Sequence, residues 1–314
     1  MRPDAGHVVT ANEGGPLRIV SLLPSATEIV YALGLEDRLV GVTHECAWPP
    51  AAAQKRHVSH TSIPADATSA EIDALVTQAV QGGPPTTWLD DEAVRELAPD
   101  LILTQDLCAV CAVPAGQVDE ALRRLDCSAE VVSLDPSTLT EVLDGILRVG
   151  AATGRDRRAA EVRAQLQERL TAVARAVAGR RRPRVFALEW ADPPFNAGHW
   201  VPEMIELAGG TPVLASPAAA SARVSWAAIE QAAPEVLVFM PCGHPMATAV
   251  REARDLLLPR PELAAVPVVV AAHGDAYFSR PGPRLVDGVE ILAGLLHPDA
   301  WPAPEPAAAR VLRG

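Results

Sequence analysis

The sequence lacks an apolar run of the roughly 20 residues that a membrane-spanning helix requires. Its first residues, Met1 to His7, are mostly polar, and they are not followed by the apolar stretch of about 7–15 residues found in secretory signals. We therefore expect no insertion into a membrane. With Met1 as the natural start, the sequence predicts a cytoplasmic protein, whereas a start upstream of Met1 would make it periplasmic.

Positive charge is scarce as well. The 27 Lys and Arg residues are outnumbered by 39 Asp and Glu residues, which gives a formal net charge of −12. Nucleic acids and anionic lipid surfaces attract basic proteins through Coulomb forces. The charge balance therefore argues against nucleic acid or a membrane surface as the main partner.

Cysteine is present in low and odd number, with five residues unevenly spaced in a chain of 314. A chain of this size can build hydrophobic cores without disulfide staples. Thiols that cluster in such a chain are predicted to contact a ligand or metal, or to act in redox chemistry.

Recognised catalytic motifs are also missing. The sequence contains no P-loop, no Gly-x-Gly-x-x-Gly, no Gly-x-Ser-x-Gly and no His-Glu-x-x-His segment. These motifs cradle phosphates, or place a nucleophile or metal beside its base. We therefore expect neither a hydrolytic nor a phosphoryl-transfer enzyme, and we predict a binding protein before an enzyme.

Short apolar runs alternate with helical patterns along most of the chain. Strands are predicted at residues 18–23, 39–43, 101–104, 130–134, 184–188, 236–240 and 268–271. Helices are predicted at residues 25–33, 68–80, 115–125, 201–207, 226–232 and 285–296. Capping-box spacing occurs at Ser25/Glu28, Thr68/Glu71 and Thr138/Glu141. This alternation predicts an α/β fold with parallel sheets.

About forty residues in the middle of the chain contain no predicted strand. Their apolar residues recur at helical spacing, with Gly150 and Gly154 marking a bend or a break, so we predict one long connecting helix. The predicted organisation is two Rossmann-like lobes on either side of this helix. Its parts are a flexible leader at 1–16, an N-terminal lobe at 17–136, the helix at 137–179, a C-terminal lobe at 180–298 and a tail at 299–314.

The two predicted lobes share a short sequence pattern. Residues 97–103 read Leu-Ala-Pro-Asp-Leu-Ile-Leu, and residues 232–238 read Ala-Ala-Pro-Glu-Val-Leu-Val. Both place a Pro and an acidic residue between a helix end and an apolar strand. The repetition indicates a weak internal duplication and favours two similar lobes.

Candidate ligand-binding residues gather in the loops that follow the predicted strands, where open parallel sheets bind their ligands. In the N-terminal lobe they are Ser25, His44, Glu45, Cys46, Trp48 and Asp106. In the C-terminal lobe they are Trp190, Asp192, Phe195, His199, Trp200, His244, Tyr277, Ser279 and Arg280. A ligand that touches residues of both lobes would lie in a cleft between them.

Four of the five cysteines also lie in these loops, namely Cys46, Cys108, Cys111 and Cys242. Cys108 and Cys111 have the spacing of metal ligands and equally that of a redox pair, although no second Cys-x-x-Cys is present. Together the four thiols could hold zinc or an iron–sulfur cluster if the lobes close on one another. Each alone is equally typical of a small buried side chain.

Aromatic residues make up only 4% of the chain, so Trp190, Trp200 and Tyr277 in presumed ligand loops exceed what core packing requires. They suit a large, flat and partly apolar ligand. Arg280 could pair with a carboxylate or phosphate, or could be a surface residue of a turn. The backbone N–H groups of the helix that begins near Ser25 could hold an anionic group.

Three of these features resemble a known family: the segment from Arg18 to Glu28, the run at 98–103 and the long connecting helix. They are similar to the helical-backbone periplasmic binding proteins over about residues 17–298, and the opening segment is most similar to the cobalamin-binding branch. That family carries cobalamin or iron–siderophore complexes to ABC transporters, with the ligand held between two lobes. The resemblance implies cobalamin or another corrinoid as ligand and an ABC transporter permease as partner.

Three functional hypotheses follow. The first is a binding protein for cobalamin or a similar metal complex that acts as a cytoplasmic carrier or sensor. The second is a metalloprotein or redox enzyme that holds zinc or an iron–sulfur cluster on its cysteines. The third is the substrate-binding component of an ABC transporter whose signal peptide lies upstream of Met1.

Overall fold

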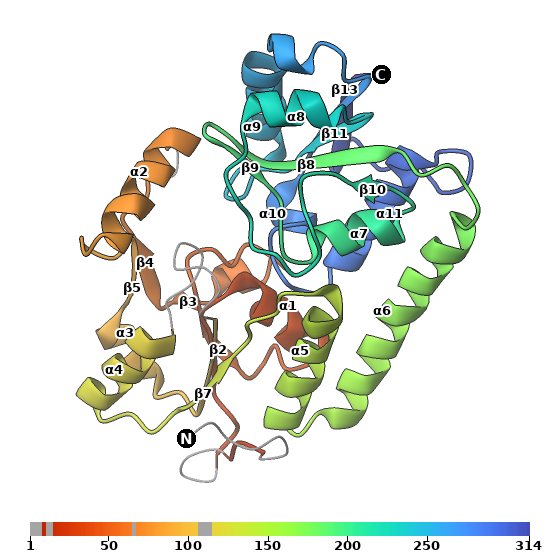
Figure 1. The fold of residues 1–314 in the computed structure, drawn as a ribbon. Helices are drawn as coiled ribbons and strands as arrows, with labels where there is room; N and C mark the ends of the chain where they lie inside the picture. The colour runs from red at the N-terminus through yellow and green to blue at the C-terminus, as the bar shows by residue number, and fades with distance from the viewer. Residues whose placement is uncertain (1–7, 11–14, 65–66, 106–114) are drawn as a thin grey trace. The chain divides into compact units, whose positions relative to one another are not determined.

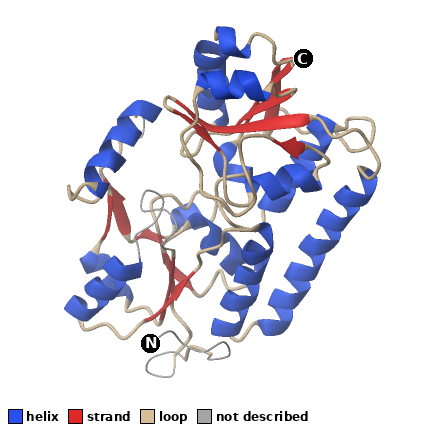
Figure 2. Ribbon diagram, in the orientation of Figure 1, coloured by secondary structure: helices blue, strands red, loops and turns tan. Residues whose placement is uncertain are grey.

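The computed structural model describes residues 8–10, 15–64, 67–105 and 115–314. The chain divides into two compact units (Figure 1). The first comprises Met1–Pro136 and Leu143–Ala164, and the second comprises Ser137–Val142 and Gln165–Gly314. Helices and strands alternate in both units (Figure 2), as the sequence predicts, and the fold class is α/β.

The first unit is built on a parallel sheet with the strand order β3-β2-β1-β6-β7. Its strands are β1 (Ile19–Ser21), β2 (Leu39–Val42), β3 (Arg56–His57), β6 (Leu101–Thr104) and β7 (Glu130–Ser133). The helices of this unit include α1 (Pro24–Ala32), α2 (Ser69–Val80), α3 (Asp91–Leu97) and α4 (Ala115–Leu125). A separate antiparallel pair, β4 (Ser59–Thr61) with β5 (Thr87–Leu89), lies between β3 and β6 in the chain.

The second unit carries a sheet with the order β10-β8-β11-β12-β13, and β9 pairs with β8. Its strands are β8 (Arg184–Ala191), β9 (Pro194–Asn196), β10 (Thr211–Pro212), β11 (Val236–Phe239), β12 (Val268–Ala272) and β13 (Ala309–Arg313). Its helices include α7 (Val201–Leu207), α8 (Trp226–Ala232), α9 (Met246–Glu252), α10 (Gly274–Tyr277) and α11 (Leu285–Leu296). The prediction of parallel sheets needs correction here, because β9 and β13 run antiparallel to their neighbours. The predicted tail supplies β13, an edge strand with several exposed residues that lacks a continuous apolar run.

The predicted connecting helix is two helices, α5 (Leu139–Ala152) and α6 (Asp156–Ala176). Gly154 adopts φ +64° at the break, a conformation that glycine reaches without strain. Gly150 allows the close approach of the two helices, since a Cβ there would lie 2.4 Å from the Cβ of Ala159. Both glycines that the sequence singled out therefore have a structural role, and of the two predicted outcomes, a bend or a break, the structure shows a break.

The three predicted capping boxes have different outcomes. Thr68 and Glu71 form a complete box at the start of α2. Thr138 and Glu141 exchange the same pair of hydrogen bonds before α5. The box predicted at Ser25 is wrong, because α1 begins one residue earlier with Pro24 in its first turn and Leu23 as its N-cap. Proline is favoured at this position because its fixed φ is already helical and it has no N–H to satisfy.

The repeated sequence pattern corresponds to the same reciprocal pair of hydrogen bonds in both units, at the start of β1 and at the start of β8. In the first unit, the backbone N–H of Arg18 donates to the Asp100 carboxylate at 2.8 Å, and the Asp100 N–H donates to the Arg18 carbonyl at 2.9 Å. In the second unit, Arg184 and Glu235 make the same exchange at 2.9 and 2.8 Å. Each acidic residue follows a helix that ends in a left-handed alanine, Ala98 or Ala233.

We expect Asp100→Ala to destabilise the protein by about 2 kcal/mol, because Asp100 is only 3% exposed and its loss removes the acceptor of the half-buried Arg18 N–H. Glu235→Ala should cost less, because the Glu235 side chain is 31% exposed. Urea unfolding monitored by circular dichroism measures both effects. The matched control is Glu120→Ala on α4, which is exposed and should change the free energy of unfolding by less than about 0.5 kcal/mol. Equal stability of the Asp100 and Glu120 variants would contradict this account.

Candidate functional site

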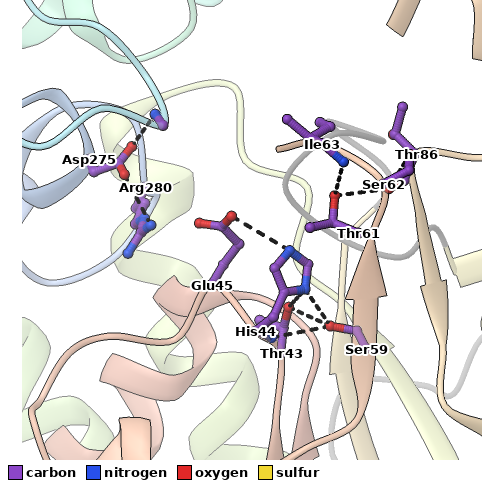
Figure 3. Close-up of polar contacts among 11 residues, drawn as sticks. Thr43, His44, Glu45, Ser59, Thr61, Ser62, Ile63, Thr86, Asp275 and Arg280 are labelled. Carbon is purple, nitrogen blue, oxygen red and sulfur yellow. Dashed lines mark hydrogen bonds and ion pairs between the residues drawn. The ribbon is translucent and has the colours of Figure 1, made fainter. Parts of the chain in front are cut away.

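In the first unit, the loop after β2 holds an imidazole in a fixed orientation. Nδ1 of His44 lies 2.8 Å from the Ser59 hydroxyl and 3.3 Å from the Thr43 hydroxyl. The Ser59 and Thr43 hydroxyls are themselves 2.8 Å apart. Nε2 of His44 lies 3.6 Å from the Glu45 carboxylate, on the opposite side of the ring (Figure 3). The carboxyl end of β2 therefore presents two of the predicted ligand-binding side chains, His44 and Glu45.

Two other predicted residues of this unit are part of its interior. Ser25 and Cys46 are each 1% exposed. The Cys46 thiol lies 3.0 Å from the hydroxyl of Thr27 on α1. Cys46 thus behaves as a small buried side chain, which is one of the two alternatives that the sequence left open. Trp48, by contrast, is 46% exposed on the surface of the same loop.

In the second unit, Trp190 and His244 meet at the carboxyl ends of neighbouring strands. Trp190 lies near the end of β8 and His244 follows β11, and these two strands pair in parallel. Their ring centroids are 5.9 Å apart. The indole is half-buried and His244 is buried. His244 also faces Glu252 of α9, with 3.7 Å between Nε2 and the nearer carboxylate oxygen.

Asp275 joins the next loop to this edge of the sheet. One carboxylate oxygen accepts a hydrogen bond of 2.7 Å from the backbone N–H of Gly243, in the loop after β11. The other accepts one of 3.2 Å from the guanidinium of Arg280 (Figure 3). The same region contains Tyr277, whose ring lies 6.2 Å from that of His273. The loops after β8, β11 and β12 therefore bring Trp190, His244 and Arg280 to the same edge of the sheet.

The remaining predicted residues of the second unit have varied environments. Trp200 is 3% exposed and its Nε1 donates to the carbonyl of Phe278 at 2.7 Å, so it packs as a core side chain. His199 is half-buried and adopts φ +53°, which is uncommon outside glycine. The Phe195 ring is contacted by the guanidinium of Arg223 at 5.5 Å. Asp192 is exposed, whereas Ser279 is half-buried.

The metal-site prediction has no support among the residues that the structure describes. In that part of the chain, no three His, Cys, Asp or Glu side chains come together to hold a metal ion. The Cys46 thiol is hydrogen-bonded to Thr27, and Cys242 is half-buried and is not part of a disulfide. Two further predicted metal ligands, Cys108 and Cys111, lie outside the described ranges. The same is true of Asp106, which was predicted to contact the ligand.

Two polar residues that support the site were missed by the sequence reasoning. Ser59, which orients His44, lies in a short strand that the apolar pattern does not reveal. Glu252, which faces His244, lies on α9, a helix that was not predicted. Asp275 stands in a loop that the sequence singled out, but its role in linking Gly243 to Arg280 had no sequence signal.

None of the helices in the described parts of the chain combines the length and the apolar character needed to cross a membrane. The chain matches the sequence profile of the periplasmic binding proteins over residues 19–271. The chain belongs to this family. The resemblance seen in the sequence is thus confirmed.

Individual relatives of this periplasmic binding protein are distant but cover most of its length. A vitamin B12-binding protein of Vibrio cholerae is 27% identical over 87% of this chain and 86% of its own. An uncharacterized ABC transporter substrate-binding lipoprotein of Bacillus subtilis is 25% identical over 95% of this chain and 85% of its own. The crystal structure of a periplasmic heme-binding protein from Pseudomonas aeruginosa has a TM-score of 0.70, with 22% identity, and the match covers 96% of this chain and 100% of that one.

Burial keeps several imidazoles near these edges neutral. It lowers the pKa of His44, and charge on His57 and His60 lowers it further. It also lowers the pKa of His199. Burial lowers the pKa of His273 as well, although the nearby Asp275 carboxylate raises it by a smaller amount. Neutral imidazoles can accept a hydrogen bond or bind a metal, which protonated ones cannot.

These shifts predict that acid weakens the folded state. An unfolded chain takes up protons at histidine near pH 6.5, whereas the buried imidazoles take them up only at lower pH. Below pH 6.5 the unfolded state therefore binds more protons, and stability falls as the pH drops. We expect a lower melting temperature at pH 5.5 than at pH 7.5.

His199→Asn should reduce this loss by roughly 1–3 °C in melting temperature, because asparagine does not titrate in this range and tolerates a positive φ. Arg157→Gln is the control, since that side chain is 94% exposed and its charge does not change between these pH values. An equal pH dependence in the wild type and the His199 variant would show that burial of this imidazole does not contribute.

Proposed function

We propose that this protein captures cobalamin or a closely related corrinoid for an ABC transporter. The single observation that carries the proposal is the cluster of Trp190, His244 and Arg280 at the carboxyl ends of β8, β11 and β12, in a chain of this family. The relative from Vibrio cholerae, named for vitamin B12, supports the choice of ligand. The Bacillus subtilis relative, named as a substrate-binding lipoprotein of an ABC transporter, supports the choice of partner.

The chemistry of this edge suits a corrinoid. A corrin ring has broad apolar faces, on which a half-buried indole such as Trp190 can pack. Its rim carries amide groups that exchange hydrogen bonds with polar side chains, and the nucleotide of cobalamin adds a phosphodiester. Arg280 and Asp275 are only 16% and 17% exposed and hold each other in place, so they offer oriented hydrogen-bonding groups at little further entropic cost.

The first unit, taken by itself, has a polar edge of the same kind. His44 and Glu45 follow β2, and the imidazole is held by Ser59. An imidazole that is neutral near pH 7 can accept a hydrogen bond from a corrinoid amide or approach its metal.

Neither of the other two sequence hypotheses is supported. The relatives named above are binding proteins, which gives no support to a metalloenzyme. A cytoplasmic carrier or sensor is likewise not favoured by the transporter-linked relative. The compartment stays a prediction, which N-terminal sequencing of the natural protein tests by finding Met1 or a processed residue at its start.

Isothermal titration calorimetry with cyanocobalamin tests the proposed function. We expect saturable binding to the wild-type protein, and Trp190→Leu should weaken it about 10-fold or more, the loss typical of an aromatic anchor. Trp88→Leu is the matched control, because Trp88 is 41% exposed on β5 and belongs to neither edge. It should change the affinity less than about twofold.

Two results would contradict the proposal. One is the absence of cyanocobalamin binding to folded wild-type protein. The other is an equal effect of Trp190→Leu and Trp88→Leu, which would remove the Trp190 cluster from the ligand site.

A further inference from the structure

His44 is anchored through one ring nitrogen by two buried hydroxyl groups. Ser59 and Thr43 are 2% and 1% exposed, and the Ser59 hydroxyl lies 2.8 Å both from Nδ1 of His44 and from the Thr43 hydroxyl. The backbone N–H of His44 also donates to the Ser59 hydroxyl at 3.2 Å. The orientation of the ring is therefore fixed from one side by hydrogen bonds within the protein, before any ligand binds.

This network is compatible with a proton on Nδ1. The Ser59 oxygen can accept from both the backbone N–H and Nδ1–H while its own proton goes to Thr43, which uses its full hydrogen-bonding capacity. Nε2 then keeps its lone pair. Burial of the ring, with the charge of the nearby His57 and His60, lowers the pKa of His44 and supports the neutral form.

Nε2 faces the other way, toward the end of the sheet. The Glu45 carboxylate lies 3.6 Å from it, beyond hydrogen-bond length (Figure 3). The Glu45 side chain is 38% exposed. A carboxylate at this distance also favours a cationic metal centre over a neutral one.

We propose that Nε2 of His44 binds the cobalt of a corrinoid by replacing an exchangeable water, with Ser59 and Thr43 as positioning residues. The inference rests on the proposed function and deepens it. In aquocobalamin the cobalt–oxygen bond breaks, a neutral water leaves and the Nε2 lone pair forms a cobalt–nitrogen bond. Cobalt remains in its +3 state, and the Nδ1 proton stays on the bond to Ser59. An imidazole whose second nitrogen is anchored in this way is the usual arrangement of a metal-binding histidine.

Visible absorption spectroscopy of two cobalamins tests the inference. Aquocobalamin carries the exchangeable water, whereas cyanocobalamin carries a cyanide that imidazole does not displace. We expect the wild-type protein to shift the aquocobalamin bands toward those of an imidazole complex and to leave the cyanocobalamin bands unchanged. It should also bind aquocobalamin about 10-fold more tightly than cyanocobalamin, the difference contributed by the new bond.

Three variants locate the effect. His44→Ala should abolish the spectral shift and the preference for aquocobalamin, and an unchanged far-UV circular dichroism spectrum shows that the variant folds. Ser59→Ala should reduce the fraction of aquocobalamin whose bands shift, because the imidazole loses the hydroxyl that orients it. His60→Ala is the matched control, because His60 is 54% exposed and should leave the shift intact.

The outcomes separate this inference from the proposed function. Binding of both cobalamins without a spectral shift, or a shift that persists in His44→Ala, would overturn the role of His44 and leave corrinoid binding in place. Failure of the wild-type protein to bind either cobalamin would overturn the proposed function and the inference with it.

Discussion

Parallel strand pairing is the constraint on which the rest of this molecule depends. Because β1, β2 and β6 run in one direction, their following loops emerge at a common edge of the first unit. The same holds for β8, β11 and β12 in the second unit. Each sheet thus has two chemically different ends. At the amino ends, Asp100 and Glu235 accept hydrogen bonds from backbone N–H groups. The carboxyl ends carry the imidazoles, the indole and the charged pairs of the candidate site.

Because the two ends of each sheet differ, the residues that stabilise the fold are not those proposed to bind a ligand. At the amino ends, acidic side chains bond backbone N–H groups of the first strand of each unit. At the carboxyl end of the second unit, Asp275 ties two loops together and holds Arg280 in place. A ligand therefore meets groups that are already oriented, and less of its interaction energy is lost in ordering them.

The sequence predicts much of the fold because its signals are local. The apolar runs at 101–104 and 236–239 coincide with β6 and β11, and the repeated Pro-acid pattern before them marks a real duplication. Elements with weak patterns could not be predicted. β3 and β4 are short and partly exposed, and β13 forms only because it pairs with the edge of β12. The start of α1 was misplaced because Pro24 outweighs the capping tendency of Ser25.

The candidate site was predictable by region but less so by residue. The loops after the strands follow from topology, and the structure places Trp190 beside His244 and Arg280 beside Asp275, while their role in ligand binding stays a prediction. Whether a side chain in such a loop faces solvent or the core depends on tertiary packing. Trp200 and Cys46 point inward, where Phe278 and Thr27 satisfy them. Ser59 could not be found, since a lone serine gains its role only from the imidazole beside it.

The central claim is that this periplasmic binding protein selects a corrinoid over other metal complexes of similar size. A direct competition tests it: the purified protein is mixed with equal amounts of cobalamin, hemin and a ferric siderophore, separated by size-exclusion chromatography and analysed by native mass spectrometry. The account predicts that cobalamin is the species retained, with one molecule per chain. Retention of hemin or the siderophore in its place would contradict it.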